Sequence, residues 1–288
     1  MYHLKNKHNI KRANSISITH YSKLKELFEK KHWVIDEDHD ISTFERYYNT
    51  LSMLNEKQQK FFIDLSYNFI HIEQINYIDY LVDLLNKIRA DFPNDNLIFV
   101  CCLPKEDSGK TKSSASVLYL IRGTSIKKKI KLDPFYAPDN VNEELFNNIK
   151  NDNFRIVLVD DFVGTGDTAM GAIDFIHELF PSLGGKNDHL LLLCIVAMEV
   201  GIKKLSGKGV KVYNSITAKK GISDYYSNEK EKLEAISCMC EIEKKIKKLN
   251  PIFHFGYNQS EALVCMERCP NNTFPIYWKM KNIAPYER

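Results

Sequence analysis

The chain lacks any apolar run long enough to cross a membrane, since no window of its 288 residues approaches about 18 consecutive apolar residues. Its first 17 residues are basic and polar and lack the apolar centre of a signal peptide. We therefore expect a cytoplasmic protein. Internal repeats and low-complexity tracts are also missing, which excludes repeat and compositionally biased classes.

Metal-site spacing is missing as well. None of the seven cysteines forms a Cys-x-x-Cys pair, and Cys238 and Cys240 are separated by one residue only. Cys101, Cys102 and Cys194 lie inside apolar runs, which is typical of core thiols. The nine histidines show no ligand spacing either. We therefore expect no structural zinc.

Strong charge of one sign is absent, because the net charge is only +3. The basic residues are nevertheless clustered, at 127–131, 203–204, 219–220 and 244–248. Such clusters are usually solvated faces, and attraction of phosphate or nucleic acid is the alternative. The lysines of 127–131 are either part of a solvated loop or part of a mobile hairpin over an active site.

What is present is one informative stretch, residues 155–168. An apolar run, 156–159, predicts a buried strand, and the adjacent carboxylates Asp160 and Asp161 close it. The turn Gly164-Thr165-Gly166 follows, and residues 169–180 then show helical spacing. We expect the two carboxylates to be exposed side by side where the strand ends.

Each part of this stretch suits a ribose 5-phosphate. Glycines let backbone N–H groups surround an oxyanion, and a helix N-terminus adds positive potential. Thr165 and Thr168 supply hydroxyl donors. Asp160 and Asp161 can accept hydrogen bonds from a sugar diol or hold hydrated Mg²⁺. A strand that ends in a solvated turn is the alternative interpretation.

The stretch 157–168 resembles the PRPP loop of type I phosphoribosyltransferases. The resemblance implies that Asp160 and Asp161 are catalytic and contact the ribose hydroxyls and Mg²⁺ through PRPP. It also implies that the loop binds the 5-phosphate, through Gly164, Thr165, Gly166, Asp167 and Thr168. In that arrangement the loop after an early strand binds pyrophosphate, and its candidates here are Lys105, Ser108, Gly109 and Lys110. A surface loop is the equally weighted alternative for those four residues.

Periodicity predicts a chain in three parts. Residues 1–92 form an N-terminal helical region, with helices near 24–34, 44–54, 55–69 and 72–92. Residues 93–215 form an α/β core with strands at 97–103, 117–122, 156–159, 190–197 and 210–213, and alternation of strand and helix predicts a parallel sheet. Residues 216–288 form a C-terminal extension packed on the core, with a helix over 228–249. The predicted fold is a type I phosphoribosyltransferase-like parallel sheet flanked by helices.

The ending Asn271-Asn272-Thr273-Phe274-Pro275-Ile276-Tyr277-Trp278 is similar to a phosphoribosyltransferase-like family with a C-terminal extension, found in bacterial conflict and antiphage gene clusters. The resemblance implies a toxic effector of antiviral defence, of the retron type, that acts on a nucleotide or nucleic acid. Its partner would be a nucleic acid or a reverse-transcriptase nucleoprotein. A homo-oligomer is compatible with the sequence.

Two positions depart from the salvage enzymes. The acid that serves there as a base toward the nucleobase is replaced by Gly164, and Asp167 places a carboxylate near the expected phosphate. Asp167 either points away and caps the helix, or the ligand is not ordinary PRPP. Three interpretations stay open: a phosphoribosyltransferase-like effector, a metabolic phosphoribosyltransferase, and a catalytically inactive ribose-phosphate-binding regulatory subunit.

Overall fold

The computed structural model describes residues 16–35, 42–107, 112–131, 135–136, 153–281 and 283–286. The chain divides into two compact units. The helical unit comprises Met1–Phe69, Tyr226–Asn250 and Pro275–Arg288, and the sheet unit comprises Ile70–Tyr225 and Pro251–Phe274. These units do not coincide with the ranges 1–92, 93–215 and 216–288, because each unit is assembled from segments distant in the sequence.

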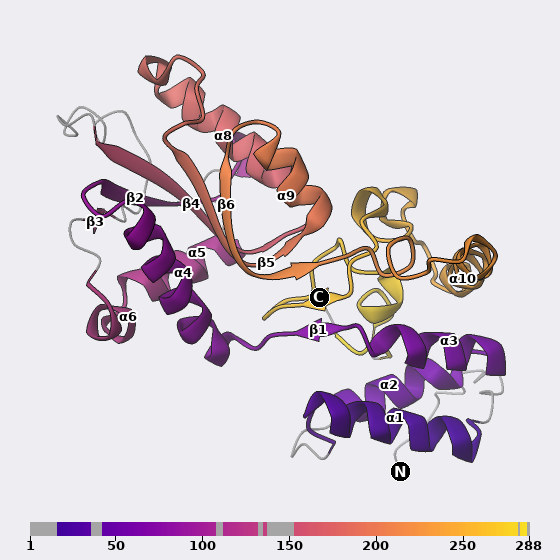
Figure 1. Cartoon of the computed structure of the whole chain (residues 1–288). Helices are drawn as coiled ribbons and strands as arrows, with labels where there is room; N and C mark the ends of the chain where they lie inside the picture. Colours follow the sequence, from indigo (N-terminus) through magenta and orange to yellow (C-terminus); the bar gives the residue numbers. More distant parts are fainter. Residues whose placement is uncertain are drawn as a thin grey trace, which may run out of the picture. The chain divides into compact units, whose positions relative to one another are not determined.

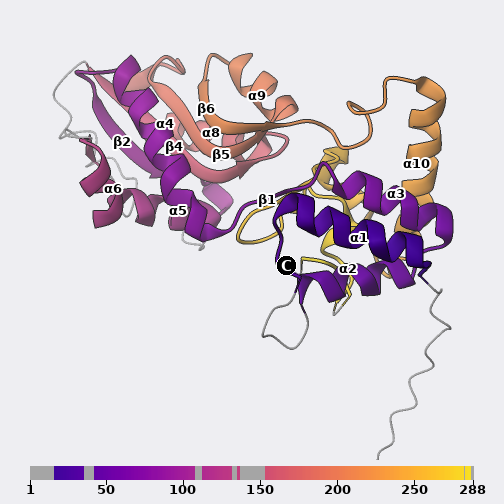
Figure 2. The same cartoon turned by 60° about the horizontal axis from the view of Figure 1, so that its bottom comes forward.

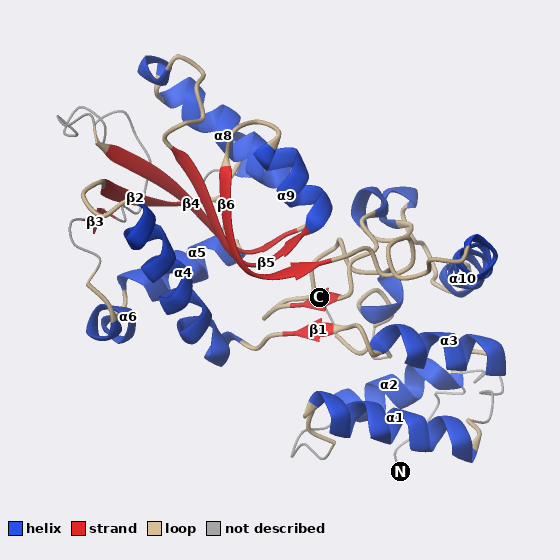
Figure 3. Cartoon of the chain, in the orientation of Figure 1, coloured by secondary structure: helices blue, strands red, loops and turns tan. Residues whose placement is uncertain are grey.

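A five-stranded parallel sheet in the order β3-β2-β4-β5-β6 forms the centre of the sheet unit (Figures 1 and 3). The strands are β2 (Asn96–Cys101), β3 (Phe135–Tyr136), β4 (Phe154–Val163), β5 (Leu190–Met198) and β6 (Lys211–Ala218). The predicted α/β class with a parallel sheet flanked by helices is therefore confirmed. The central strand β4 is longer than the predicted 156–159 and includes both aspartates.

Helices cover both faces of this sheet. On one face, α4 (Tyr77–Asp91), α5 (Ser113–Arg122) and α6 (Thr124–Lys129) pack with Val157 and Val159 in one apolar cluster. On the other, α8 (Asp167–Leu179) and α9 (Glu199–Ser206) pack with Ile156 and Leu158 in a second cluster. The alternation along β4 explains the two clusters, because successive strand residues point to opposite faces.

Two predictions for the sheet unit are wrong. Residues 117–122, expected to be a strand, form the second half of α5, and lysines 127–129, expected in either a solvated loop or a hairpin, end the helix α6. The apolar residues Val117, Leu118 and Ile121 are buried on one helical side. A short apolar run fits a strand and a helix equally well, so periodicity alone could not decide between them.

A second, two-stranded sheet pairs β1 (Ile70–His71) with β7 (Val264–Cys265) in parallel. Short 3₁₀ turns complete the sheet unit: η1 (Gln74–Asn76), η2 (Lys105–Asp107), η3 (Pro181–Leu183), η4 (Pro251–Phe253) and η5 (Tyr257–Gln259). The pairing joins the start of the sheet unit to residues 251–274. This late segment thereby becomes part of the sheet unit.

The helical unit contains α1 (Ile18–Lys31), α2 (Thr43–Ser52), α3 (Glu56–Ser66), α10 (Glu229–Glu243) and the turn η6 (Pro275–Tyr277) (Figure 2). A capping box begins α3, because Asn55 and Gln58 bond reciprocally. No helix among the described residues is long and apolar enough to cross a membrane.

Candidate functional site

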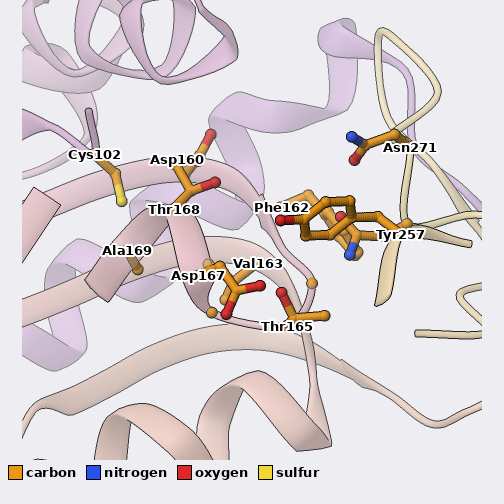
Figure 4. A pocket seen from close by; sticks show the side chains of 13 residues that line it. Cys102, Asp160, Phe162, Val163, Thr165, Asp167, Thr168, Ala169, Tyr257 and Asn271 are labelled. Carbon is orange, nitrogen blue, oxygen red and sulfur yellow. The ribbon is translucent and has the colours of Figure 1, made fainter. Parts of the chain in front are cut away.

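A cavity of ≈ 260 Å³ lies at the carboxyl end of β4 (Figure 4). In parallel sheets, ligands bind beyond these strand ends. One side of the cavity is formed by strand residues and a second by the loop between β4 and α8. The remaining side, called the third wall below, is formed by residues of the segment 251–274. The cavity is lined by Cys102, Asp160, Phe162 and Val163, by the loop and helix start 164–169, and by Tyr257, Asn271 and Asn272.

Of the two adjacent acids, Asp160 is the one that lines the cavity, although its residue surface is only 9% exposed. Its Oδ1 accepts hydrogen bonds from Ser113 Oγ at 2.8 Å and from the backbone N–H of Asp161 at 2.9 Å. Burial raises the pKa of the Asp160 carboxyl well above its usual range, and the neighbouring Asp161 raises it further, while the Ser113 hydrogen bond opposes the change.

Asp161 does not line the cavity. It is 5% exposed, and its Oδ2 accepts a hydrogen bond of 3.1 Å from the hydroxyl of Tyr77 in α4. The Tyr77 oxygen accepts in turn from the backbone N–H of Glu267 at 3.1 Å. Burial and then the Asp161 charge raise the pKa of Tyr77, which keeps this hydroxyl a donor. The expectation of two exposed carboxylates is therefore wrong, because β4 continues through both of them.

The loop between β4 and α8 has the geometry of an anion site. Gly166 adopts a φ of 83°, which favours glycine, and it precedes α8 without capping its N-terminus by a side chain. A Cβ on Gly201 would lie 2.4 Å from the carbonyl oxygen of Gly164, so α9 starts directly against this loop. The N–H groups of the first turn of α8 and the hydroxyls of Thr165 and Thr168 supply donors.

Asp167 is the first residue of α8 and does not cap the helix, so the capping explanation is wrong. Its carboxylate forms an ion pair with Lys204 of α9 and accepts a 2.9 Å hydrogen bond from Asn258 Nδ2. Partial burial raises the pKa of Asp167, but hydrogen bonds from Lys204, Thr165 and Asn258 outweigh it and lower the pKa overall. Asp167 thus carries a charge that Lys204 neutralises.

The third wall was missed by sequence reasoning. Tyr257, Asn271 and Asn272 come from the segment 251–274 (Figure 4). The Asn-Asn-Thr triplet was noticed only as part of a family ending, and nothing local placed it at a site. Ser113, Tyr77 and Lys204 were also missed, since each reaches the site through a contact distant in sequence.

The pyrophosphate-loop candidates are described only in part. Lys105 does not line the cavity, and its Nζ donates to Glu178 Oε2 at 2.5 Å. Ser108, Gly109 and Lys110 lie outside the described residues. A pyrophosphate-binding role for this loop stays a prediction.

The protein side chains around the cavity supply few ligands for a Mg²⁺ ion. Within the described ranges, no group of three or more His, Cys, Asp or Glu side chains could hold a metal. Asp160 fits as a direct or water-mediated ligand, and Asp161 does not while Tyr77 holds it. Mg²⁺ would therefore have to be carried mainly by ligand phosphates, as it often is.

Comparison with known proteins places this chain in a family. The phosphoribosyltransferase-like family PRTase-CE, named for a C-terminal extension, matches residues 55–287. No curated protein matches the chain.

Two solved structures are similar to parts of the chain. The APRTase from Giardia lamblia complexed with 9-deazaadenine is 14% identical, with 47% of this chain and 78% of that one covered and a TM-score of 0.28. The orotate phosphoribosyltransferase from Aeropyrum pernix is 20% identical, with 54% and 73% covered and a TM-score of 0.27. At TM-scores this low, the two similarities add nothing to the family assignment.

Proposed function

Because the chain belongs to the PRTase-CE family, we propose that it binds PRPP or a related ribose 5-phosphate with Mg²⁺ and acts as a phosphoribosyltransferase. One observation carries this proposal: the loop 164–168, the N-terminus of α8 and Asp160 all line one cavity. Phosphate binding at a helix start and diol binding at a carboxylate are thereby available in the same cavity.

Each side of the cavity takes a part of the ligand in this proposal. The 5-phosphate accepts hydrogen bonds from the loop and the first turn of α8, and the pair of Asp167 with Lys204 leaves the local charge close to neutral. Asp160 accepts from a ribose hydroxyl through Oδ2, since Ser113 and the Asp161 N–H engage Oδ1. Mg²⁺, held by the diphosphate and Asp160, would neutralise charge on the departing pyrophosphate.

The proposed reaction breaks the bond between the ribose anomeric carbon and the diphosphate oxygen, which leaves with the electron pair. A lone pair of the acceptor forms the new bond to that carbon. Positive charge develops on the ribose ring, and the Asp160 carboxylate stabilises it because Asp160 itself is almost fully buried.

A regulatory subunit that binds ribose phosphate without catalysis is the second candidate. Two observations favour it. Tyr77 holds Asp161 away from the cavity, and Gly164 supplies no side chain to serve as a base. An ordinary metabolic enzyme would need a base from elsewhere, and the carboxylates of the described lining are Asp160 and Asp167, of which Asp167 is engaged by Lys204 and Asn258.

We further propose that the protein is a toxic effector of an antiphage system of the retron type, held inactive by a nucleic acid or nucleoprotein partner. Support comes from the resemblance of 271–278 to the conflict-system family and from the match to PRTase-CE. If a phosphate-bearing partner binds the lysine clusters, its affinity should fall steeply with salt.

Calorimetric titration with PRPP and Mg²⁺ tests binding, and pyrophosphate release tests turnover. Wild type and Asp174→Asn, a change at an exposed aspartate of α8, should bind alike, whereas Asp160→Asn should weaken binding at least tenfold. Binding without release over all acceptors selects the regulatory subunit. No binding by the wild type refutes the proposed ligand.

Expression in bacteria tests the effector role. Wild type should arrest growth, and the double variant Asp160→Asn, Asp161→Asn should be harmless at equal protein levels. Complementation of a nucleobase-salvage mutant by the wild type would instead show a metabolic enzyme.

A further inference from the structure

The third wall of the cavity is built on a strained backbone. Four residues other than glycine have positive φ within seven positions: Phe255 (57°), Asn258 (51°), Gln259 (54°) and Glu261 (53°). Such conformations persist only where surrounding contacts fix them, and they cluster at ligand-binding sites. The segment 255–261 therefore has a defined shape that its own local preferences would not select.

The backbone of Asn272 is fixed by this segment. Its carbonyl oxygen accepts from the backbone N–H of Ala262 at 3.1 Å and from Ser260 Oγ at 2.8 Å. A Cβ on Gly256 would lie 1.9 Å from the same oxygen, so only glycine allows this approach. The backbone of Asn272 is thus held by two hydrogen bonds and by the close approach of Gly256.

The side chain of Asn272 covers Gly164 of the loop between β4 and α8. A Cβ built on Gly164 would lie 2.3 Å from both Cγ and Nδ2 of Asn272 and 2.5 Å from its Oδ1. The face of the amide therefore occupies the space that any larger residue at 164 would need. The loop and the third wall meet at this contact, and Asn258 of the third wall also donates to Asp167 at the start of α8.

The amide also carries an unsatisfied donor. Nδ2 of Asn272 is buried and has no hydrogen-bond partner within the part of the chain that the structure describes. Buried amide donors are almost always paired, because leaving one unpaired is unfavourable. The residue lines the cavity, so a rotation about its Cβ–Cγ bond would be the movement that brings this donor to a bound molecule.

We propose that Asn272 is the specificity-determining residue of the pocket, and that its Nδ2 donates a hydrogen bond to a carbonyl oxygen or ring nitrogen of the group carried at the ribose anomeric carbon. This rests on the proposed function, in which the loop takes the phosphate and Asp160 the ribose hydroxyls. The side with Tyr257, Asn271 and Asn272 is then left for the third part of the ligand.

An amide in this position selects a group without activating it. It donates a hydrogen bond but, unlike a carboxylate, does not take a proton at neutral pH. The group that Asn272 reads must therefore present a lone pair, and its nucleophilic atom must react without a base at position 164.

The test compares ribose 5-phosphate with the four 5′-mononucleotides AMP, GMP, CMP and UMP by calorimetry. Ribose 5-phosphate carries a hydroxyl at the anomeric carbon, where a nucleotide carries its base. The ratio of the Kd of ribose 5-phosphate to that of a nucleotide therefore measures the contribution of the base to binding. The wild type should bind at least one nucleotide more tightly than ribose 5-phosphate. Asn272→Ala and the nearly isosteric Asn272→Asp should each reduce that ratio about tenfold.

Two further variants distinguish the loss of the Nδ2 donor from a general effect of substitution on the protein. Asn86→Ala, the same change at an exposed position of α4, should keep the ratio of the wild type. Gly164→Ala should displace the amide and reduce the ratio as Asn272→Ala does, and it should cause no further loss once Asn272 is already alanine. Melting temperatures show that each variant is folded.

The remaining outcomes overturn the proposal. Equal weakening of ribose 5-phosphate and nucleotides by Asn272→Ala would make Asn272 a structural residue only. If the wild type binds ribose 5-phosphate but binds no nucleotide more tightly, Asn272 does not determine specificity. The proposed phosphate site would remain valid in that case. A wild type that binds neither would refute the proposed function and this inference together.

Discussion

The hydroxyl of Tyr77 lies 3.1 Å from Oδ2 of Asp161 and holds that carboxylate on the α4 side of the sheet. Of two adjacent acids, one therefore faces the cavity and the other is engaged inside the protein. The pair has divided roles in this structure, and the division can be tested at Tyr77.

Tyr77→Phe should destabilise the protein by about 1–3 kcal/mol, because it leaves a buried carboxylate without this donor and the Glu267 N–H without its acceptor. Urea unfolding measures the effect. Tyr119→Phe, at a tyrosine that is 75% exposed, is the matched control and should change little. Equal midpoints for the two variants would show that the Tyr77 hydrogen bond contributes nothing to stability.

Asp160 should make stability depend on pH. Burial, followed by the Asp161 charge, raises the pKa of Asp160 in the folded protein, so the folded state holds this proton more tightly than the unfolded chain. The associated stability is fully present below the unfolded pKa of about 3.9 and is lost as the pH rises through the raised folded value.

Asp160→Asn removes this loss, so its stability relative to wild type should increase as the pH rises above the unfolded pKa of about 3.9 and through the raised folded value. Urea unfolding at several pH values measures the difference, with Asp174→Asn as the control. A difference that stays constant or shrinks with pH would contradict the shift.

Lys204 should matter for phosphate affinity because it neutralises Asp167. Lys204→Met leaves that carboxylate uncompensated beside the bound phosphate and should weaken ribose 5-phosphate about tenfold. The adjacent Lys203→Met, at a side chain that is 80% exposed, should have little effect.

A second variant makes this prediction sharper. Adding Asp167→Asn to Lys204→Met should recover most of the lost affinity, since the repelling charge is then gone. Failure to recover would mean that Lys204 contacts the phosphate itself, and no loss in Lys204→Met would show that the ion pair plays no part.

Glu261 anchors the strained segment that carries the third wall. Its buried carboxylate accepts from the backbone N–H groups of Ile222 (3.0 Å) and Ser223 (2.7 Å) and from Ser223 Oγ (2.5 Å). Glu261→Gln should cost about 1.5–3 kcal/mol of unfolding free energy, whereas Glu267→Gln at an exposed position should cost much less. Similar unfolding midpoints would refute this anchoring role.

The part of the site that lies on one continuous stretch could be predicted from the sequence. Strand, loop and helix follow one another over 154–179, and local propensity and glycine content signal each of them. The third wall could not be predicted, because Asn272 reaches Gly164 through contacts between residues more than a hundred positions apart.

The mistakes have the same origin. Val117 to Arg122 is apolar enough for a strand and is helical because one side of it packs on β2 and β4. Asp161 was expected to be exposed because the strand was expected to end before it. Tyr77, which lies 84 residues earlier in the chain, contacts its carboxylate from α4. Tertiary contacts decided both cases.

The helical unit has a consequence for synthesis of the chain. Phe69 stacks on Tyr286 at 5.1 Å and lies 4.5 Å from the ring of Tyr277, and Phe62 lies 5.0 Å from Tyr277. At ribosomal rates of about 5–20 residues per second, these tyrosines emerge about 10–40 s after the phenylalanines. During that interval the first three helices expose aromatic side chains that the tyrosines later cover, and transiently exposed apolar surface of this kind favours aggregation.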